Sequence, residues 1–273
     1  MKILDGKKIA DRLLAKIDRE IKKQRLKLKL AAVLVGNDPA SLSFVGRKKQ
    51  ACGKVGVGFA LYRFSINISQ KILEKQVRKI AKDQKISGII IQLPLPKSID
   101  TDSILNLVPL GKDVDGLSRK GLEKFKKGKS KISPPVVGAV KKLLQVYKIK
   151  IRGKKVLVIG KGRLVGQPLT TWLPRQGTIV LTADKSTKNL AGLCLKADII
   201  ISGVGKPGLI SGEMIKKGAV IIDVGSSKKA GRIVGDVNFE SCAKKAGAIS
   251  PVPGGVGPLT VACLLENLLK LDQ

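Results

Sequence analysis

One stretch of the chain combines residue types that can handle a proton. Phe44 and Lys48 lie four residues apart in a segment opened by Asp38-Pro39. An aspartate at the N-cap and a proline at the first helical position favour a helix, in which residues four apart share one face. A lysine partly desolvated beside an apolar ring has a lowered pKa and can transfer protons. The competing interpretation is a solvated lysine on a basic helix.

Two further segments supply an amide and a carboxylate. Gln92 opens QLPLP (92–96), at the carboxyl end of the apolar run Gly88–Ile91, where α/β proteins place ligands. An amide there can orient a substrate or a lysine, but a proline-stiffened strand exit explains the segment equally well. Asp115, in KDVDG (112–116), can accept paired hydrogen bonds from a guanidine-like edge. An Asx-turn before the glycine is the alternative.

A glycine-rich segment, GKGRLVG (160–166), follows the apolar run Lys155–Ile159. A strand, a glycine turn and a helix present backbone N–H groups to a phosphate, and glycines let a pyrophosphate approach closely. The spacing is one residue longer than the usual fingerprint, and a tight turn is the alternative. Asp184 lies eighteen residues after Gly166, just past the next apolar run, and this context favours dinucleotide binding.

The segment PVPGGVGP (251–258) holds three glycines and three prolines in eight residues. Such a composition fixes an irregular backbone directly after an apolar series of strands and helices. It is either a rigid hinge between domains or a cradle for a ligand, and both interpretations remain open.

The elements that must position these residues alternate along the chain. Short Val- and Ile-rich runs predict parallel strands covered on both faces, and longer amphipathic stretches between them predict helices. The strand candidates are Ala31–Gly36, Gly88–Gln92, Lys155–Ile159, Thr178–Thr182, Asp198–Ser202 and Ala219–Val224. The helix candidates are Lys7–Lys23, Pro39–Val55, Gln70–Gln84, Val136–Tyr147 and Leu259–Leu271.

A polar, basic and glycine-containing stretch, 112–131, marks a boundary in the middle of the chain. A second series of strands and helices begins at Lys155. The sequence therefore predicts two α/β domains, residues 1–117 and 133–255. The amphipathic tail, within 259–273, is expected to return to the first domain.

Composition excludes several kinds of chemistry. The chain has 273 residues, no histidine, and 53 Lys and Arg against 20 Asp and Glu, a formal charge of +33. Without histidine there is no His-based triad, His metal site or imidazole catalysis, and we expect no metal. Such a charge favours polyanions, but the basic residues are spread almost end to end, as in a lysine-rich solvated surface. The two densest basic runs, Lys16–Lys29 and Arg119–Lys131, contain almost no aromatic residues. Neither run therefore resembles a platform on which nucleic-acid bases stack.

Cysteine usage and hydropathy bound the cellular context. Cys52, Cys194, Cys242 and Cys263 are widely separated, which predicts neither a disulfide framework nor a zinc site but reduced cytosolic thiols. The N-terminus lacks the apolar run of a signal peptide. No stretch of about 18 apolar residues exists, so no membrane span is expected.

Taken together and in this order, the segments resemble the bifunctional methylenetetrahydrofolate dehydrogenase/cyclohydrolase family. The resemblance covers nearly the whole chain, and QLPLP, KDVDG and PVPGGVGP are highly specific as a set. The further matching segments are DPAS (38–41), the helix 44–48, GIII (88–91), VGKPG (204–208), IDVG (222–225) and VGDV (234–237).

The resemblance implies an interdomain cleft that places a tetrahydrofolate derivative against NADP, in a folate domain and a Rossmann-like dinucleotide-binding domain. It implies oxidation of methylenetetrahydrofolate to the methenyl form, then hydrolysis to 10-formyltetrahydrofolate, within one-carbon metabolism and purine biosynthesis. By position, Lys48 is central to hydrolysis, Gln92 is its hydrogen-bond partner, and Asp115 binds the pterin. Folate contacts are expected from Phe44, Ile91, Leu93, Pro253, Gly254, Gly255, Val256 and Gly257, and cofactor contacts from Gly160, Lys161, Gly162, Lys185 and Ser226.

Three departures from the family pattern matter. Phe44 stands where the family usually has tyrosine, so the stacking face is kept and the hydroxyl lost. Ser133-Pro134-Pro135-Val136 replaces the usual P-C-T-P segment, and Asp184-Lys185 replaces a polar segment often containing His-Ser. Asp184 favours the free 2′-hydroxyl of NAD, whereas Lys161 and Lys185 attract the 2′-phosphate of NADP.

The main interpretation is a cytoplasmic, homodimeric, NADP-dependent folate enzyme with both activities, and NAD remains possible. One alternative is a dehydrogenase with weak or no cyclohydrolase activity, because of Phe44. A more remote one is a basic nucleic-acid-binding protein on this scaffold. We expect no membrane and no specific nucleic acid as partners.

Overall fold

The computed structural model describes residues 1–229 and 231–272, and it divides into two α/β units. Unit 1 comprises Met1–Ala10 and Val136–Thr260, and unit 2 comprises Asp11–Pro135 and the chain from Val261 onward. The predicted α/β class is therefore confirmed.

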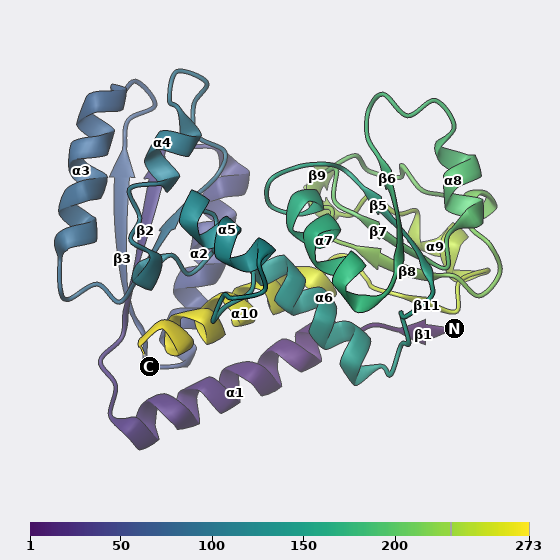
Figure 1. The fold of residues 1–273 in the computed structure, drawn as a ribbon, viewed down its shortest axis with the longest axis horizontal. Coiled ribbons are helices and arrows are strands. Elements are labelled where there is room, and N and C mark those ends of the chain that lie inside the picture. Colours follow the sequence, from purple (N-terminus) through teal and green to yellow (C-terminus); the bar gives the residue numbers. More distant parts are fainter. Residues whose placement is uncertain (230, 273) are drawn as a thin grey trace. The chain divides into compact units, whose positions relative to one another are not determined.

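Unit 2 is built on a three-stranded parallel sheet in the order β3-β2-β4. The strands are β2 (Lys29–Val35), β3 (Gly58–Phe64) and β4 (Gly88–Ile91). The helices that contribute to this unit are α1 (Gly6–Gln24, from Asp11 on), α2 (Pro39–Lys54), α3 (Gln70–Lys82), α4 (Thr101–Leu105), α5 (Arg119–Lys126) and α10 (Val256–Asp272, from Val261 on). Figure 1 shows α3, in blue, running alongside β2 and β3.

The two faces of this sheet bury different helices. Alternate residues of β2, such as Val33, pack in one cluster with Leu73 and Val77 of α3 and Ile104 of α4. On the other face, a Cβ added at Gly88 would lie 2.5 Å from the Leu268 Cδ1 of α10. Glycine in β4 therefore allows α10 to approach the strand closely, which is the usual reason for glycine inside a strand.

Unit 1 is built on a six-stranded sheet in the order β1-β11-β8-β7-β5-β6, parallel throughout. Its strands are β1 (Lys2–Ile3), β5 (Lys155–Ile159), β6 (Ile179–Ala183), β7 (Ile199–Ser202), β8 (Val220–Asp223) and β11 (Ala248–Ile249). A separate antiparallel ribbon pairs β9 (Ser227–Lys229) with β10 (Arg232–Val234). The helices are α6 (Pro135–Val146), α7 (Gly166–Trp172), α8 (Leu190–Lys196) and α9 (Phe239–Ala243).

The strand order reverses at β5. The chain passes from β5 to β6 on one side, and the next strand, β7, pairs with the other side of β5. In open parallel sheets, ligands bind in the crevice outside the carboxyl ends of the strands at such a switch point. The segments that follow Ile159 and Ser202 therefore lie where this fold is expected to bind a ligand.

Two features differ from the sequence-based domain boundaries. Residues 1–10 were expected in the first domain, but they belong to unit 1, because Lys2 and Ile3 pair with Ala248 and Ile249 in the unit 1 sheet. A two-residue strand is too short to give a periodic signal. The expected boundary segment 112–131 also contains a helix, α5, which Ser118 caps at its N-terminus and Phe125 anchors by burial.

The last helix and the cysteines complete the packing. The Asn267 side chain in α10 donates hydrogen bonds to the carbonyls of Val114 at 2.9 Å and Ser133 at 2.8 Å. All four cysteines are buried thiols. Within residues 1–229 and 231–272, the structure contains no helix that is both long and apolar enough to cross a bilayer.

Candidate active site

The polar centre of unit 2 is a lysine–amide pair. The Asp38 carboxylate accepts the Ser41 N–H at 2.8 Å and so begins α2, with Pro39 in its first turn. Ten residues further, the Lys48 Nζ donates a hydrogen bond to the Gln92 Oε1 at 3.0 Å. The helix and the end of β4 thus place these two side chains together.

The Gln92 side chain is held in one orientation. Its backbone N–H bonds to the Val33 carbonyl at 2.9 Å, which continues the pairing of β4 with β2. Its Nε2 donates to the Leu93 carbonyl at 2.8 Å, and the residue is 7% exposed. Because the amide nitrogen is committed to Leu93, the amide oxygen faces the lysine.

Burial sets the electrostatics of this pair. Desolvation lowers the pKa of the Lys48 ammonium, and the nearby Asp115 and Cys52 oppose that shift. Burial raises the pKa of Asp115 to about 6, while Lys48 opposes the rise and Asp113 adds to it. The site therefore holds an amine more easily deprotonated than a surface lysine and a carboxylate that titrates near neutrality.

The two aspartates of KDVDG have separate tasks. The Asp113 carboxylate accepts the backbone N–H of Leu117 at 3.2 Å and of Ser118 at 2.8 Å, and it is 4% exposed. The turn before α5 is therefore closed by Asp113. Asp115, by contrast, is half-buried and lies within electrostatic reach of Lys48.

The three apolar side chains of unit 2 that were expected to contact folate differ in their surroundings. Phe44 is half-buried, and its ring carries the Arg47 guanidinium at 5.5 Å from the ring centroid. Ile91 and Leu93 pack against the core cluster that contains α3. The Ile91 side chain, 4% exposed, is thus occupied by the core, so a contact with substrate from this residue would come from its backbone, whereas the half-buried Leu93 keeps part of its side chain exposed.

The glycine loop of unit 1 requires glycine at defined positions. Gly160 has φ +99°, and its N–H bonds to the Ala183 carbonyl at 2.8 Å. A Cβ added at Gly166 would lie 1.9 Å from the Gly160 carbonyl oxygen, whereas one at Gly162 would meet nothing within 4 Å. The first and last glycines close the turn, and the middle one leaves the backbone open to a ligand.

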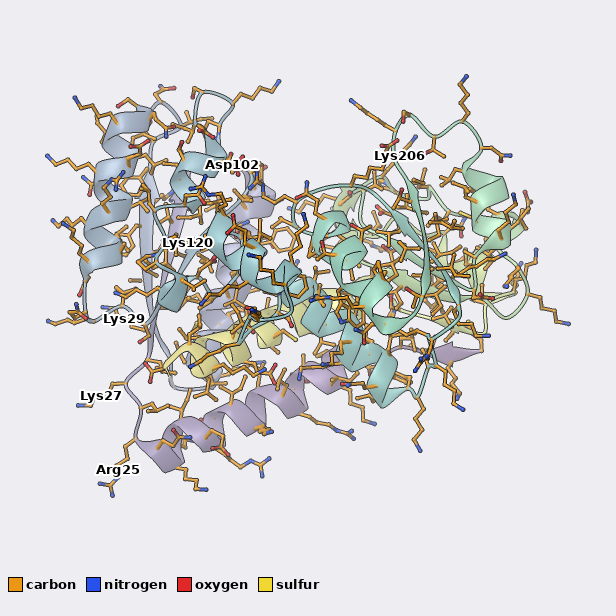
Figure 2. All side chains as sticks on the ribbon, in the orientation of Figure 1. Arg25, Lys27, Lys29, Asp102, Lys120 and Lys206 are labelled. Carbon is orange, nitrogen blue, oxygen red and sulfur yellow. The ribbon has the colours of Figure 1, made fainter. Side chains whose placement is uncertain are left out.

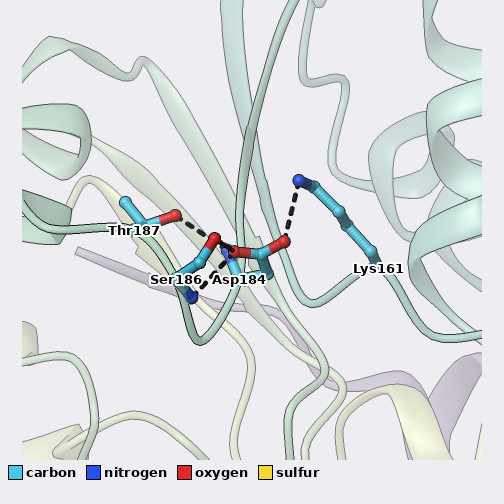
Figure 3. Close-up of polar contacts among 4 residues, drawn as sticks. All are labelled: Lys161, Asp184, Ser186 and Thr187. Carbon is cyan, nitrogen blue, oxygen red and sulfur yellow. Dashed lines mark hydrogen bonds and ion pairs between the residues drawn. The ribbon is translucent and has the colours of Figure 1, made fainter.

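An ion pair that the sequence did not reveal joins the ends of β5 and β6. The Lys161 Nζ lies 2.8 Å from the Asp184 Oδ2 (Figure 3). The Asp184 Oδ1 accepts the Ser186 hydroxyl at 2.6 Å and its N–H at 3.0 Å, and the Asp184 N–H bonds to the Thr187 hydroxyl at 3.0 Å. The Lys161 and Ser186 contacts hold the pKa of Asp184 well below its usual range.

The remaining cofactor and folate candidates lie in the same unit. Lys185 and Ser226 are exposed, after β6 and β8 respectively. The Gly254 carbonyl accepts the Lys7 N–H at 2.8 Å, and a Cβ on Gly6 would lie 1.9 Å from the Gly255 carbonyl oxygen. The segment Pro253–Gly257 is therefore tied to the start of α1 and leads directly into α10.

Sequence reasoning missed two buried polar residues of this unit. Ser202 and Asp236 are both fully buried and hydrogen-bonded to each other at 2.7 Å. The only signals were a serine ending an apolar run and the GDV of VGDV (234–237). Neither signal reveals a contact across 34 residues.

The basic surface shows no focus on one element. Arg25 and Lys27, at the turn after α1, extend away from the ribbon in Figure 2. Lys206, in unit 1, and Lys120, on α5, are also exposed. Exposed cations thus belong to both units and to helices and loops alike, as in a solvated basic surface.

Unit 1 has its glycine loop at a topological switch point, as dinucleotide-binding units do, and unit 2 brings a lysine, an amide and a carboxylate close together. This combination is that of a dinucleotide-dependent enzyme. The chain belongs to the tetrahydrofolate dehydrogenase/cyclohydrolase family. The family model for the NAD(P)-binding domain matches residues 134–273, and that for the catalytic domain matches residues 4–115.

Individual relatives cover the chain almost completely. The bifunctional protein FolD of Nitratiruptor sp. is 42% identical over 99% of this chain and 97% of its own length. The crystal structure of the bifunctional methylenetetrahydrofolate dehydrogenase/cyclohydrolase of Campylobacter jejuni has a TM-score of 0.94 at 37% identity, covering 99% and 98% of the two chains. The Trypanosoma brucei enzyme, in complex with NADP and an inhibitor, has a TM-score of 0.93 at 32% identity, covering 98% and 96%.

These matches confirm the family expected from the loop motifs. They give no support to a nucleic-acid-binding function. The relatives are named as bifunctional enzymes, which also gives no support to the alternative of a dehydrogenase without hydrolysis.

Proposed function

We propose that this chain oxidises 5,10-methylenetetrahydrofolate with NADP and hydrolyses the methenyl product to 10-formyltetrahydrofolate. The observation that carries the proposal is the hydrogen bond from Lys48 to Gln92, in a family whose relatives are bifunctional. NADP as cofactor is supported by the NAD(P)-binding family model and by the relative in complex with NADP.

The oxidation step depends on positioning. The carbon that loses hydride lies between two nitrogens, so the resulting cation is delocalised and no base is required. NADP, when bound, supplies the hydride acceptor. Its site would be formed by Gly160, Lys161 and Gly162, since the open backbone at Gly162 admits a close ligand. Asp115 would accept paired hydrogen bonds from the pterin and so fix the face presented for transfer.

The hydrolysis step depends on proton management. Water that attacks the methenyl carbon loses both of its protons: one is released as the cation's charge is neutralised, and a ring nitrogen gains the other as the carbon–nitrogen bond opens and the formyl group forms. Lys48, whose pKa desolvation lowers, is suited to exchange these protons, and Gln92 holds its ammonium in place. Phe44 supplies a ring face but no hydroxyl to this step.

An absorbance assay tests the proposed function directly. The purified chain is given methylenetetrahydrofolate with NADP or, separately, with NAD, and formation and decay of the methenyl form are followed. We expect formation with NADP and subsequent decay through hydrolysis. If no methenyl form appears with either cofactor, the proposed function is wrong.

Cofactor choice yields a separate prediction. Replacing both Lys161 and Lys185 by alanine should raise the KM for NADP by about tenfold, because two cations that attract the 2′-phosphate are removed. The KM for NAD should hardly change. Steady-state kinetics with both cofactors measure the effect. Replacing Lys161 alone should raise the KM for NADP by less, because Asp184 already balances part of the charge of Lys161.

Asp184→Ser provides the counterpart of that double variant. Removing the carboxylate frees Lys161 and abolishes like-charge repulsion of the phosphate, so the KM for NADP should fall. An enzyme that prefers NAD from the outset, and loses NAD use in Asp184→Ser, would contradict the assignment of the lysines.

A homodimer is the proposed assembly, and the edge strand β3 supports it. β3 pairs only with β2 among the described residues, so one side of its backbone is available for a second copy of the chain. Leu61, 44% exposed, adds apolar area on that strand. Sedimentation of the parent chain and of Leu61→Lys tests this: we expect a dimer in the parent and a shift to monomer in the variant. A parent chain that sediments as a monomer would contradict the proposal.

The cytoplasm is the proposed location. Four buried cysteine thiols suit a reducing compartment. The proposed folate and NADP substrates are consistent with it.

A further inference from the structure

Two buried carboxylates that the proposed chemistry does not use lie at the carboxyl ends of the unit 1 strands. Asp223 ends β8 and is 2% exposed, and Asp236, which follows β10, is fully buried. Buried carboxylates without a cationic partner are stable only when several donors satisfy them. The groups that donate hydrogen bonds to each carboxylate therefore show which backbone segments it fixes.

Asp236 holds the segment after β7. Its Oδ1 accepts the backbone N–H of Gly205 at 2.9 Å and of Lys206 at 2.8 Å. Its Oδ2 accepts the N–H of Val204 at 2.8 Å and the Ser202 hydroxyl at 2.7 Å. Three consecutive backbone N–H groups therefore converge on one carboxylate, which fixes the path of Val204–Lys206.

Asp223 in turn holds Asp236. Its Oδ1 accepts the backbone N–H of Asp236 at 3.1 Å and of Gly225 at 2.9 Å, and its Oδ2 accepts that of Val237 at 2.9 Å. The Asp223 N–H bonds to the Ser250 hydroxyl at 2.7 Å, just before the segment Pro253–Gly257. The two aspartates thus link the segments that follow β7 and β8 through their carboxylates, and the segment that follows β11 through the backbone N–H of Asp223. These three strands are neighbours in the sheet.

Two glycines beside the pair lack the Cβ atoms that would collide with the carboxylates. A Cβ added at Gly225 would lie 2.3 Å from the Asp236 carboxyl carbon, and one at Gly235 would lie 2.0 Å from the Asp223 Oδ2. Both contacts are shorter than any real Cβ tolerates. The local sequence is therefore shaped around the two carboxylates.

The segment that Asp236 holds adjoins the glycine loop. The Gly203 N–H bonds to the Ile159 carbonyl at 3.0 Å, and a Cβ at Gly160 would lie 3.0 Å from the Gly203 carbonyl oxygen. A Cβ at Gly203 would lie 2.5 Å from the Val165 Cγ1. The segments after β5 and β7 therefore pack together at the switch point, where a dinucleotide binds.

We propose that Asp236 is a positioning residue for NADP: it sets the backbone of Val204–Lys206 beside the glycine loop, and Asp223 fixes Asp236 in turn. The inference rests on the proposed function for its ligand. The carboxylate acts through the backbone and not by touching the substrate. It accepts the N–H groups of Val204–Lys206, so these groups are not available to donate hydrogen bonds to the cofactor's phosphates, and the loop keeps one conformation.

Asp236→Asn tests the proposal, because it keeps the shape of the side chain and turns one acceptor into a donor that faces N–H groups. The probe is NADPH, titrated by its fluorescence against the parent chain and the variant at a temperature well below unfolding. We expect the Kd to rise roughly tenfold or more. Hydrolysis of supplied methenyltetrahydrofolate, which needs no cofactor, should stay within about twofold of the parent rate.

The matched control is Asp198→Asn, at the amino end of the same sheet. The Asp198 carboxylate accepts the Lys155 N–H at 2.8 Å and pairs with Lys216, so its replacement removes a carboxylate charge that holds backbone away from the switch point. We expect its NADPH Kd to match that of the parent. Equal Kd values for Asp236→Asn and Asp198→Asn would overturn the proposal. So would a loss of methenyl hydrolysis in proportion to the loss of NADPH affinity, which would indicate general loosening.

A milder variant keeps the test decisive if Asp236→Asn does not fold. Ser202→Ala removes one of the four donors to Asp236 and leaves three backbone N–H groups. It should raise the NADPH Kd about threefold, and a Kd equal to that of Asp198→Asn would overturn the proposal. A parent chain that binds no NADPH would overturn the proposed function as well, which separates that failure from a failure of the positioning role alone.

Discussion

Lys48→Met should lower the rate of methenyltetrahydrofolate hydrolysis by about 100-fold or more while hydride transfer to NADP is largely retained. The physical reason is that only the hydrolytic step moves protons at the reacting carbon, and Lys48 is the amine that desolvation prepares for that exchange. Methionine keeps the length of the side chain and removes the ammonium that bonds to Gln92. Single-turnover absorbance measurements of each step separate the two rates.

Lys49→Met is the matched control for this variant. Lys49 is the next residue of α2 and is exposed, so it loses the same charge without touching Gln92. Both rates should stay close to those of the parent. A Lys48→Met enzyme that still opens the methenyl form at the parent rate would show that Lys48 is a structural lysine.

Asp115→Asn should weaken binding of a folate ligand by about 1–3 kcal/mol, because an amide donor would then face the donors of the pterin. Binding of NADPH should be nearly unchanged. Titration with a folate ligand by calorimetry measures the loss. Asp83→Asn serves as the control, since the Asp83 carboxylate accepts the Lys85 N–H within a loop and has no proposed ligand.

The pH dependence of folate binding is an independent test of the role of Asp115. The pKa of Asp115 is raised to about 6, so the ionised form that accepts two hydrogen bonds dominates above pH 6 and is lost below it. Affinity of the parent should therefore fall as the pH falls through about 6, and Asp115→Asn should abolish that fall. An unchanged affinity in Asp115→Asn, with the same pH profile, would mean that Asp115 only shapes the turn.

The strands that are buried on both faces could be predicted from the sequence. Gly88–Gln92 and Lys155–Ile159 agree with β4 and β5 to within one residue, because continuous Val and Ile runs need cover on both sides. β3 was not predicted, because GFALYRF alternates exposed and half-buried residues on an edge strand and gives no continuous run. β1 and β11 are two residues long, which is below any periodic signal.

The candidate site was predictable where its residues stand in distinctive loops. QLPLP and KDVDG identify Gln92 and Asp115 as candidates, but not the task of Asp113, which depends on where α5 begins. The Lys161–Asp184 ion pair was not predictable, because it requires knowing that β5 and β6 are neighbours. The contact of Ser202 with Asp236 depends in the same way on the fold and not on local pattern.

The polypeptide passes between the two units at residues 10–11, 135–136 and 260–261. A protease that cuts once in the exposed, lysine-rich segment 127–129 would therefore release no independent domain. The amino-terminal piece would keep β1 in the sheet of the carboxyl-terminal piece, and that piece would keep Asn267 bonded to Val114 of the first. The two pieces are interlocked, so a nicked molecule should stay associated under native conditions. For the same reason, neither unit can be exchanged between relatives as a cassette by one genetic crossover.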